Sequence, residues 1–430
     1  MNTETTSSRR AFIKRSSLLF AGGAVGGPLS VVRAAHSFGS DTIRLGVVGC
    51  GWRGTRAVIE ALDTTTDARV QPNGSIRVTA MADLFGDRMQ AAYRAVKGKY
   101  PHSVDVGPDR RFTGFEGFQQ LLQTDVDVVI MATPPCFRPL HFEAAVRAGK
   151  HVYLEAPVAT DAPGVRRVLT ANEGAKANGL AVAVGLRRHH EERYQEIVRR
   201  VWDGAVGNVR LARTYCNTAD ARFRPRACGQ AELEYQLRNW HRFRWLSGDP
   251  MVEKHVQQLD VINWLKQGYP IECNGMGGQT SCGSLAGKRV FDHHFVEYTY
   301  ADGAKLYAQC RQAAHCWNCV AEFARGTCGA ADMSGGKIYD SQNELVWRFG
   351  PGGGKGHQHE QRNLFNALRT GVVPNEGDYG AKSTLAAIMG RMATVSGNVV
   401  TWDEAIRSNQ ALADIDRLTS LDSPAPTGHV

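Results

Sequence analysis

Three glycines, Gly49, Gly51 and Gly54, follow the apolar run Leu45 to Val48 and precede a helical pattern. Gly49 permits a tight turn, Gly51 lets the backbone approach a pyrophosphate, and Gly54 allows a helix to pack closely on a sheet. The amino end of that helix then faces the phosphates. This strand–turn–helix context predicts a dinucleotide-binding unit.

A carboxylate stands at the end of the next apolar strand, SIRVTAMADLF, at Asp83. A carboxylate there accepts hydrogen bonds from ribose hydroxyls and repels a 2′-phosphate, which favours NAD over NADP. The spacing from the glycines exceeds the usual value of about 20 residues, and the polar stretch DTTTDARVQPNGS is interpreted as an inserted loop. The alternative role for Asp83 is a helix N-cap.

Short strands and helices alternate through the first part of the chain. VDVVIMATPP is typical of a buried parallel strand, RPLHFEAAVRAGK of a helix, and HVYLEAP of the next strand. This alternation predicts an α/β fold with a doubly wound parallel sheet.

The motifs together resemble one oxidoreductase family. The glycine motif, the segment Ala132-Thr133-Pro134-Pro135 with His141, and AGKHVYLEAP are similar to those of the Gfo/Idh/MocA family. The resemblance is strong from residue 42 to about 160 and looser beyond. It implies an N-terminal Rossmann domain, expected at 37–158, and an α/β domain with a large open, mostly antiparallel sheet, expected at 159–418. Residues 419–430 are expected to be a disordered tail.

The resemblance also implies a nicotinamide cofactor, a sugar, glycoside or polyol substrate, and dimers or tetramers formed through the open sheet. Thr133 and Pro134 are expected to lie against the cofactor, and Glu155 near the nicotinamide ribose. With the residues of the glycine-rich turn, the expected NAD-binding set is Gly49, Gly51, Trp52, Arg53, Gly54, Asp83, Thr133, Pro134, His141 and Glu155.

Two catalytic residues of the family are replaced in this chain. The family has a lysine where this sequence has Ala156, and a histidine on a helix where it has Gln257. Glu253, Gln257 and Asp260 share one face of that helix, but a glutamine cannot take a proton from a hydroxyl group. His255 lies about 200° away by the helix repeat and enters the site only if the helix starts late.

Three functional hypotheses follow for these replacements. Other groups do the acid–base work, with His255, Glu253, Tyr235, His190 or Arg311 as candidates, and Gln257 stays in the catalytic set as a residue that can bind a hydroxyl group. Alternatively, NAD is used transiently, as in related NAD-dependent glycosidases, whose segment also lacks the lysine. In the third hypothesis, the protein binds cofactor and sugar without turnover.

A polar and aromatic stretch, YQLRNWHRFRWLSGDP, is expected to bind the substrate. Aromatic faces stack on sugar rings, and arginine or asparagine binds hydroxyl groups. The alternative is a surface loop packed on the sheet. With residues from other segments, the substrate-binding candidates are Arg187, His190, Arg238, Asn239, Trp240, Asp260, Arg311 and Trp317.

The N-terminus predicts export. Residues 1–36 hold the pair Arg9-Arg10, a weakly apolar, glycine-rich segment and a small-residue cleavage site, which resembles a twin-arginine (Tat) signal and predicts a periplasmic or otherwise exported protein. Part of the net charge of +9 lies there, and no long basic run follows, which disfavours nucleic-acid binding. No metal site is predicted, because the CxxC pair is single and His357 and His359 form a weak signal in a glycine-rich loop.

Overall fold

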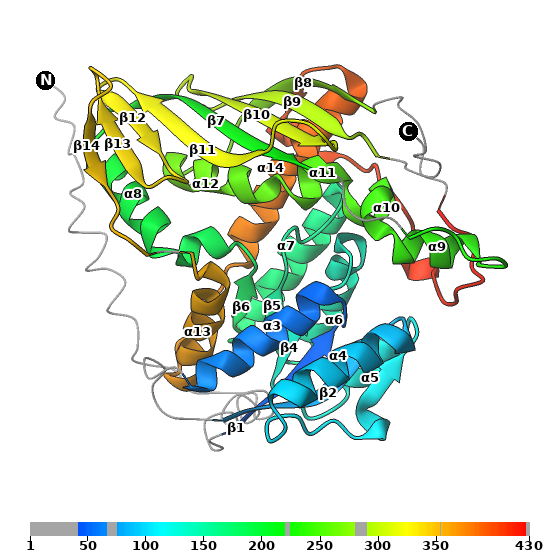
Figure 1. The fold of residues 1–430 in the computed structure, drawn as a ribbon. Helices are drawn as coiled ribbons and strands as arrows, with labels where there is room; N and C mark the ends of the chain where they lie inside the picture. Colours follow the sequence, from blue (N-terminus) through cyan, green and yellow to red (C-terminus); the bar gives the residue numbers. More distant parts are fainter. Residues whose placement is uncertain (1–41, 67–74, 220–223, 280–289, 353, 427–430) are drawn as a thin grey trace, which may run out of the picture. The chain divides into compact units, whose positions relative to one another are not determined.

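Two sheets organise the described residues, which are 42–66, 75–219, 224–279, 290–352 and 354–426 (Figure 1). The predicted Tat segment lies outside them. The first sheet is entirely parallel and has the order β3-β2-β1-β4-β5-β6. This confirms the predicted doubly wound sheet. Its strands are β1 (Thr42–Val48), β2 (Ser75–Asp83), β3 (Arg111–Thr113), β4 (Val128–Met131), β5 (His151–Leu154) and β6 (Val182–Val184). The sheet thus includes β6, which follows the expected domain boundary at residue 158.

Helices cover both faces of this parallel sheet. Along β1, Leu45 and Val47 belong to a buried cluster with α3, α4 and α13, whereas Val48 belongs to a cluster with α5, α6 and α7. This double burial explains why the strands are apolar without interruption. The helices are α3 (Trp52–Asp63), α4 (Gly86–Lys99), α13 (Gly356–Arg369), α5 (Gly117–Leu122), α6 (Arg138–Arg147) and α7 (Ala162–Ala177).

The second sheet has nine strands in the order β14-β13-β12-β11-β7-β10-β9-β8-β15. β7 and β10 run parallel, and the other neighbours run antiparallel, as predicted for a mostly antiparallel sheet. The strands are β7 (Val209–Thr218), β8 (Glu272–Gly278), β9 (His293–Thr299), β10 (Lys305–Gln312), β11 (Cys319–Gly326), β12 (Gly329–Asp332), β13 (Lys337–Asp340), β14 (Leu345–Arg348) and β15 (Val400–Thr401).

One face of the second sheet packs on helices, which Figure 1 shows along its inner side. Val296, Tyr298 and Tyr300 are buried on this face, as their alternation predicts, and Phe295 on the opposite face is 41% exposed. The helices of this half are α8 (Glu192–Trp202), α9 (Glu232–Arg238), α10 (Arg244–Ser247), α11 (Asp249–Glu253), α12 (Val256–Lys266), α14 (Gly377–Ser396) and α15 (Trp402–Arg407), with the 3-10 turns η4 (Arg187–His190) and η5 (Trp240–Arg242).

The C-terminal segment differs from the expectation of disorder. Leu418 is buried, and Leu421 and Ala425 pack against the same apolar cluster, which contains Phe137 and Trp245. Residues up to 426 therefore form part of the folded structure, because their apolar side chains pack against the turn before α6 and against α10. Among the described helices, none combines the length and apolar character needed to cross a membrane.

Candidate functional site

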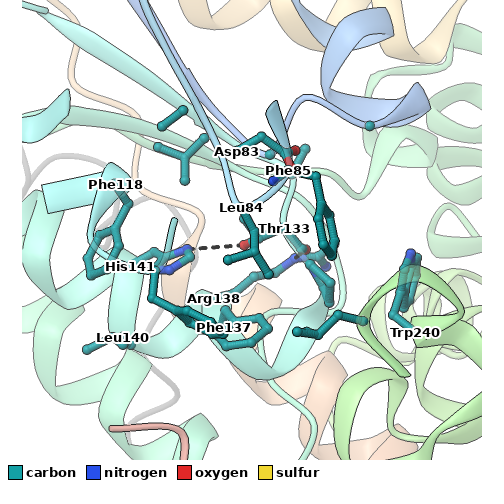
Figure 2. Close-up of a pocket in the computed structure, with 18 of the residues that line it drawn as sticks. Asp83, Leu84, Phe85, Phe118, Thr133, Phe137, Arg138, Leu140, His141 and Trp240 are labelled. Carbon is teal, nitrogen blue, oxygen red and sulfur yellow. Dashed lines mark hydrogen bonds between the residues drawn. The ribbon is translucent and has the colours of Figure 1, made fainter. Parts of the chain in front are cut away.

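A cavity of about 670 Å³ lies at the carboxyl end of the parallel sheet. Its wall comes from the turn after β1, the end of β2, the segment after β4, the end of β5, and later parts of the chain. Figure 2 shows Trp240, from such a later segment, together with residues of the parallel-sheet half. The predicted site residues that line the cavity are Gly49, Gly51, Trp52, Arg53, Asp83, Thr133, Pro134, His141, Glu155, Trp240 and Glu253.

The glycine-rich turn fits a dinucleotide. Gly49 has a φ of +94°, and a Cβ atom there would lie 2.7 Å from the backbone nitrogen of Thr133. A Cβ atom on Gly54 would lie 1.9 Å from the carbonyl oxygen of Gly49, so both positions require glycine. A Cβ atom on Gly51 would meet nothing within 4 Å. The turn is therefore closely packed at Gly49 and Gly54 and open at Gly51, where a pyrophosphate would lie.

Asp83 organises the turn at the end of β2. Its carboxylate accepts hydrogen bonds from the backbone nitrogens of Cys50, at 2.7 Å, and Phe85, at 2.8 Å. Burial raises the pKa of Asp83, and these two bonds oppose that shift. Helix α4 begins at Gly86 with Phe85 at its N-cap position, so the N-cap alternative for Asp83 is wrong.

A hydrogen-bonded set fixes the segment after β4. Thr133 Oγ1 lies 3.2 Å from His141 Nδ1 (Figure 2), and burial lowers the pKa of His141 to about 3, so its ring is neutral. Arg138 donates to the carbonyl oxygens of Thr133 at 2.8 Å, of Glu155 at 3.0 Å and of Pro157. This one guanidinium holds together the two loops that carry Thr133 and Glu155.

Glu155 is held by a cation on the cavity wall. Its Oε1 accepts from Arg53 Nε at 2.6 Å, and Arg53 also donates to Glu60 at 2.8 Å. Burial acts to lower the pKa of Arg53, but Glu155 and Glu60 raise it above its usual range. Ala156 follows on the same wall and contributes only a methyl group.

The helix predicted around Glu253 and His255 is broken. Helix α11 ends at Glu253 and α12 begins at Val256. Glu253 lines the cavity, and burial raises its pKa. The late start does not bring His255 to the cavity: it is fully buried, with Nε2 2.9 Å from Thr214 Oγ1 on β7, and burial lowers its pKa to about 3. The structure therefore does not support His255 as the catalytic base.

Two other residues of the predicted helix face support a neighbouring turn instead of lining the cavity. Gln257 donates to the carbonyl oxygen of Gly185 at 2.8 Å. Asp260 lies 2.7 Å from His189 Nε2 and accepts a hydrogen bond from Ser383 at 2.7 Å. Both contacts hold the β6–η4 segment, so these polar side chains have structural partners.

The predicted substrate stretch contributes Trp240 to the cavity, and its other predicted residues have structural partners. Tyr235 packs edge-on against Phe243 at 6.0 Å between ring centroids. Asn239 accepts from the backbone nitrogen of Arg224 and donates to the carbonyl of Tyr235. Arg238 pairs with Asp87 and Glu234. These three residues lie in or directly after α9, so the alternative of a surface loop does not describe them either.

Four further substrate candidates also lie off the cavity wall. Arg187 pairs with Glu191 at 3.4 Å, and His190 with Glu376 at 3.5 Å. Arg311 shares the exposed face of the second sheet with Tyr307, and it donates to the carbonyl of Trp317. Trp317 is 61% exposed and packs edge-on against Tyr215. The strand alternation places Arg311 opposite the helices, so it faces away from the cavity.

Sequence reasoning missed much of the cavity wall. Its apolar part comes from aromatic side chains on three separate segments, and the C-terminal segment closes one side through Ile415, Asp416, Leu418 and Thr419. Arg138 could have been predicted from the sequence, because it is the first residue of the helix that follows Thr133. The residues that the sequence analysis did not name include Leu84, Phe85, Arg88, Phe115, Phe118, Phe137, Arg138, Leu140, Ile415 and Leu418.

Comparison with known proteins supports the interpretation of the cavity as a dinucleotide-binding site. Residues 43–186 match the GFO_IDH_MocA oxidoreductase family, which has an NAD-binding Rossmann fold. The chain is 28% identical over 177 residues to a dTDP-3,4-didehydro-2,6-dideoxy-alpha-D-glucose 3-reductase of Actinomadura kijaniata, covering 40% of this chain and 44% of the relative. It is 28% identical over 170 residues to an inositol 2-dehydrogenase of Rhizobium meliloti strain 1021, covering 40% and 44%.

These curated relatives are matched over about half of their length or less. Among solved structures, an aldose-aldose oxidoreductase from Caulobacter crescentus complexed with glycerol aligns with a TM-score of 0.65 at 20% identity, covering 84% of this chain and 99% of that one. This likeness extends the shared fold through the second sheet. The family match covers residues 43–186, so the part of the chain that is similar to the Gfo/Idh/MocA oxidoreductases is the NAD-binding Rossmann part.

Proposed function

We propose that the chain is an NAD(P)-dependent oxidoreductase, with NAD preferred, that acts on a hydroxyl group of a sugar, glycoside or polyol. The observation that carries this proposal is the single cavity that joins the glycine-rich turn and Asp83 to Ala156, Trp240 and Glu253. The printed activities of the two curated relatives, a sugar-nucleotide reductase and an inositol dehydrogenase, support the substrate class.

The residues of the cavity suit hydroxyl oxidation without the family lysine. When bound, the nicotinamide supplies the hydride acceptor. Glu253 is the proposed general base: it lies on the wall, and its raised pKa brings it closer to the working pH than an ordinary glutamate. Trp240 offers an aromatic face against a sugar ring. Arg138 and Arg53 hold the loops that orient Thr133 and Glu155.

Calorimetric titration with NAD and NADP, after removal of any co-purified cofactor, tests the cofactor part. We expect tighter binding of NAD, since Asp83 repels a 2′-phosphate. Equal or tighter binding of NADP would remove that role from Asp83, and Arg88 on the same wall would then be the residue to examine.

A screen of sugars, polyols and glycosides with NAD, followed by absorbance and product chromatography, tests the reaction. NADH formation with a carbonyl product supports the proposal. Glycoside cleavage without net NADH identifies the alternative, a redox glycosidase that uses NAD transiently. Binding without any product identifies a non-catalytic cofactor- and sugar-binding protein.

We further propose that the protein is exported by the Tat route and that copies associate through the exposed face of the second sheet. The twin-arginine segment supports export. Exposed apolar side chains on the outer strands, including Met276 at 72% and Phe295 at 41%, support the association.

A further inference from the structure

A pair of fully buried polar side chains lies behind the cavity and has no part in the roles above. The hydroxyl of Tyr153, on β5, donates to Glu360 Oε2, on α13, at 2.7 Å. Glu360 is 1% exposed, and its second oxygen, Oε1, has no hydrogen-bond partner among the described residues. A buried carboxyl group with an unmade hydrogen bond is costly when it is ionised. Its presence calls for an explanation beyond packing.

Arg53 connects this pair to the cavity. Arg53 Nη2 lies 3.3 Å from the hydroxyl of Tyr153, and Arg53 Nε donates to Glu155, which lines the cavity, at 2.6 Å. His357 completes the group, with Nδ1 3.3 Å from Arg53 Nη2 and 3.5 Å from Glu360 Oε2. The side chain of His357 is 33% exposed, so the cluster of Tyr153, Glu360, Arg53 and His357 contacts solvent through His357. His357, predicted in a glycine-rich loop, lies at the start of α13 and belongs to this cluster.

The charges in the cluster do not balance when every carboxyl group is ionised. Glu60 and Glu155 both pair with Arg53, and Glu60 also pairs with Arg56, so Glu360 would add a third negative charge against two cations. Burial raises the pKa of Glu360 to about 8, with a further upward contribution from Glu155 and an opposing one from His190. The titratable and charged groups that face Glu360 are Tyr153, Arg53, Glu60, Glu155, His189, His190, His357, Glu376 and Tyr379.

We propose that Glu360 is a proton-storing positioning residue, which gains or loses a proton as the charge at the Glu155 end of the cavity changes. This inference rests on the proposed function. Glu360 is expected to release its proton to solvent when the oxidised cofactor, with its positively charged nicotinamide ring, occupies the cavity. It is expected to keep that proton when the reduced cofactor, whose ring is neutral, is bound. During oxidation of an alcohol, the ionised Glu360 could then take up the one proton that the hydroxyl group loses. The two electrons leave the alcohol with the hydride.

Proton-linked calorimetry tests the proposal without turnover. Binding of NAD and of NADH is measured between pH 7 and 9 in buffers of different ionisation enthalpy, which gives the number of protons released with each. We expect the unaltered protein to release more protons with NAD than with NADH. Glu360→Gln should abolish the Glu360-dependent part of that difference, and Tyr153→Phe should reduce it. Glu173→Gln, which changes an exposed carboxylate on α7 away from the cluster, is the control and should retain the difference.

The outcomes separate the two proposals. An unchanged difference in folded Glu360→Gln, with circular dichroism as the check on folding, overturns the proton-storing role and leaves the cofactor assignment intact. If Glu360→Gln does not fold, an unchanged difference in Tyr153→Phe overturns it instead. Absence of binding heat with either cofactor in the unaltered protein removes the proposed function, and this inference with it. Glu253 also titrates at the cavity, so the comparison is repeated in a Glu253→Gln background, where the Glu360-dependent part must persist.

Discussion

At the scale of single residues, position 156 decides how a hydroxyl proton can move. Ala156 carries no proton or charge, whereas a lysine beside the cations Arg53 and Arg138 would have a lowered pKa. We expect Ala156→Lys to raise NADH formation about 10-fold or more, which corresponds to roughly 1.4 kcal/mol of barrier. Initial rates by absorbance measure it, and Ala156→Gln, which adds length without a titratable group, is the control. Equal rates of NADH formation in both variants would show that a titratable group at position 156 does not assist the reaction.

Glu253 is the residue for which the largest loss of rate is expected. Glu253→Gln keeps the shape of the side chain but cannot accept a proton, so kcat should fall by roughly 10²–10⁴-fold. Because burial raises the pKa of Glu253, kcat/KM of the unaltered protein should rise with pH through that raised value, and the variant should lose this limb. Glu173→Gln, an exposed position on α7, is the control. A pH profile that keeps the same limb in Glu253→Gln would assign the base elsewhere.

The sequence predicted the cofactor half of the site better than the catalytic half. Gly49, Gly51 and Asp83 follow a local strand–turn–helix pattern, so their positions depend on neighbours in the chain. His255 and Glu253 are two residues apart, and which of them reaches the cavity depends on a break between α11 and α12. That break is set by packing against β7 and the parallel half, which the helical periodicity does not reveal.

At the scale of elements, the C-terminal segment is the part of the cavity wall with the weakest sequence signal. In residues 412–419, Leu412, Ile415 and Leu418 recur every three positions, but the segment is short and forms only a 3-10 turn, so its position depends on contacts with distant elements. The backbone nitrogen of Leu412 donates to Asp161 at 2.9 Å, and Asp416 pairs with Arg167 at 3.2 Å. These contacts hold Ile415 and Leu418 against the cavity. The strands and the two sheets, by contrast, follow periodicities that are visible in the sequence.

Removal of residues 411–430 should therefore weaken cofactor binding without unfolding the two sheets. We expect about a 10-fold increase in the Kd of NAD, or roughly 1.4 kcal/mol, because one apolar side of the cavity becomes open to water. Calorimetry measures the affinity, and thermal unfolding checks the fold. Arg417→Ala is the control: it removes one exposed ion pair inside the segment, with Asp414, worth roughly 0–1 kcal/mol. An unchanged Kd in the truncated protein would show that this segment does not cover the cofactor.

At the scale of the whole molecule, the proposed export depends on the first 36 residues. The Tat route transports folded proteins, so a cofactor bound by the cavity could be loaded before transport. We expect that replacement of Arg9 and Arg10 by lysine retains the protein inside the cell. Cell fractionation with immunodetection measures this, and replacement of Arg33 by lysine is the control. Unchanged export of the double variant would contradict the proposed signal.

The proposed association between copies uses the outer face of the second sheet. Paired strands place Met276 beside Phe295, and Phe295 stacks on Tyr307 with ring centroids 6.1 Å apart. Tyr215 continues the face, with Trp317 and Phe323 packed edge-on against it. These strands carry no helix on that side (Figure 1), among the residues that the structure describes. A face of adjacent apolar and aromatic side chains gains free energy when a second copy covers it.

A charge placed on this face should separate the copies. In the assembled form, a lysine at position 295 would be buried without a partner for its charge. In a two-fold interface each residue occurs twice, so the cost would be several kcal/mol per interface. We expect Phe295→Lys to convert a dimer or tetramer into a smaller species at micromolar concentration, as measured by analytical ultracentrifugation. Val372→Lys, at a position 58% exposed in the connection between α13 and α14, adds the same charge away from the sheet and should leave the assembly unchanged. Equal masses for the unaltered protein and Phe295→Lys would mean that this face is not the interface, and dissociation by Val372→Lys would point to the α13–α14 side instead.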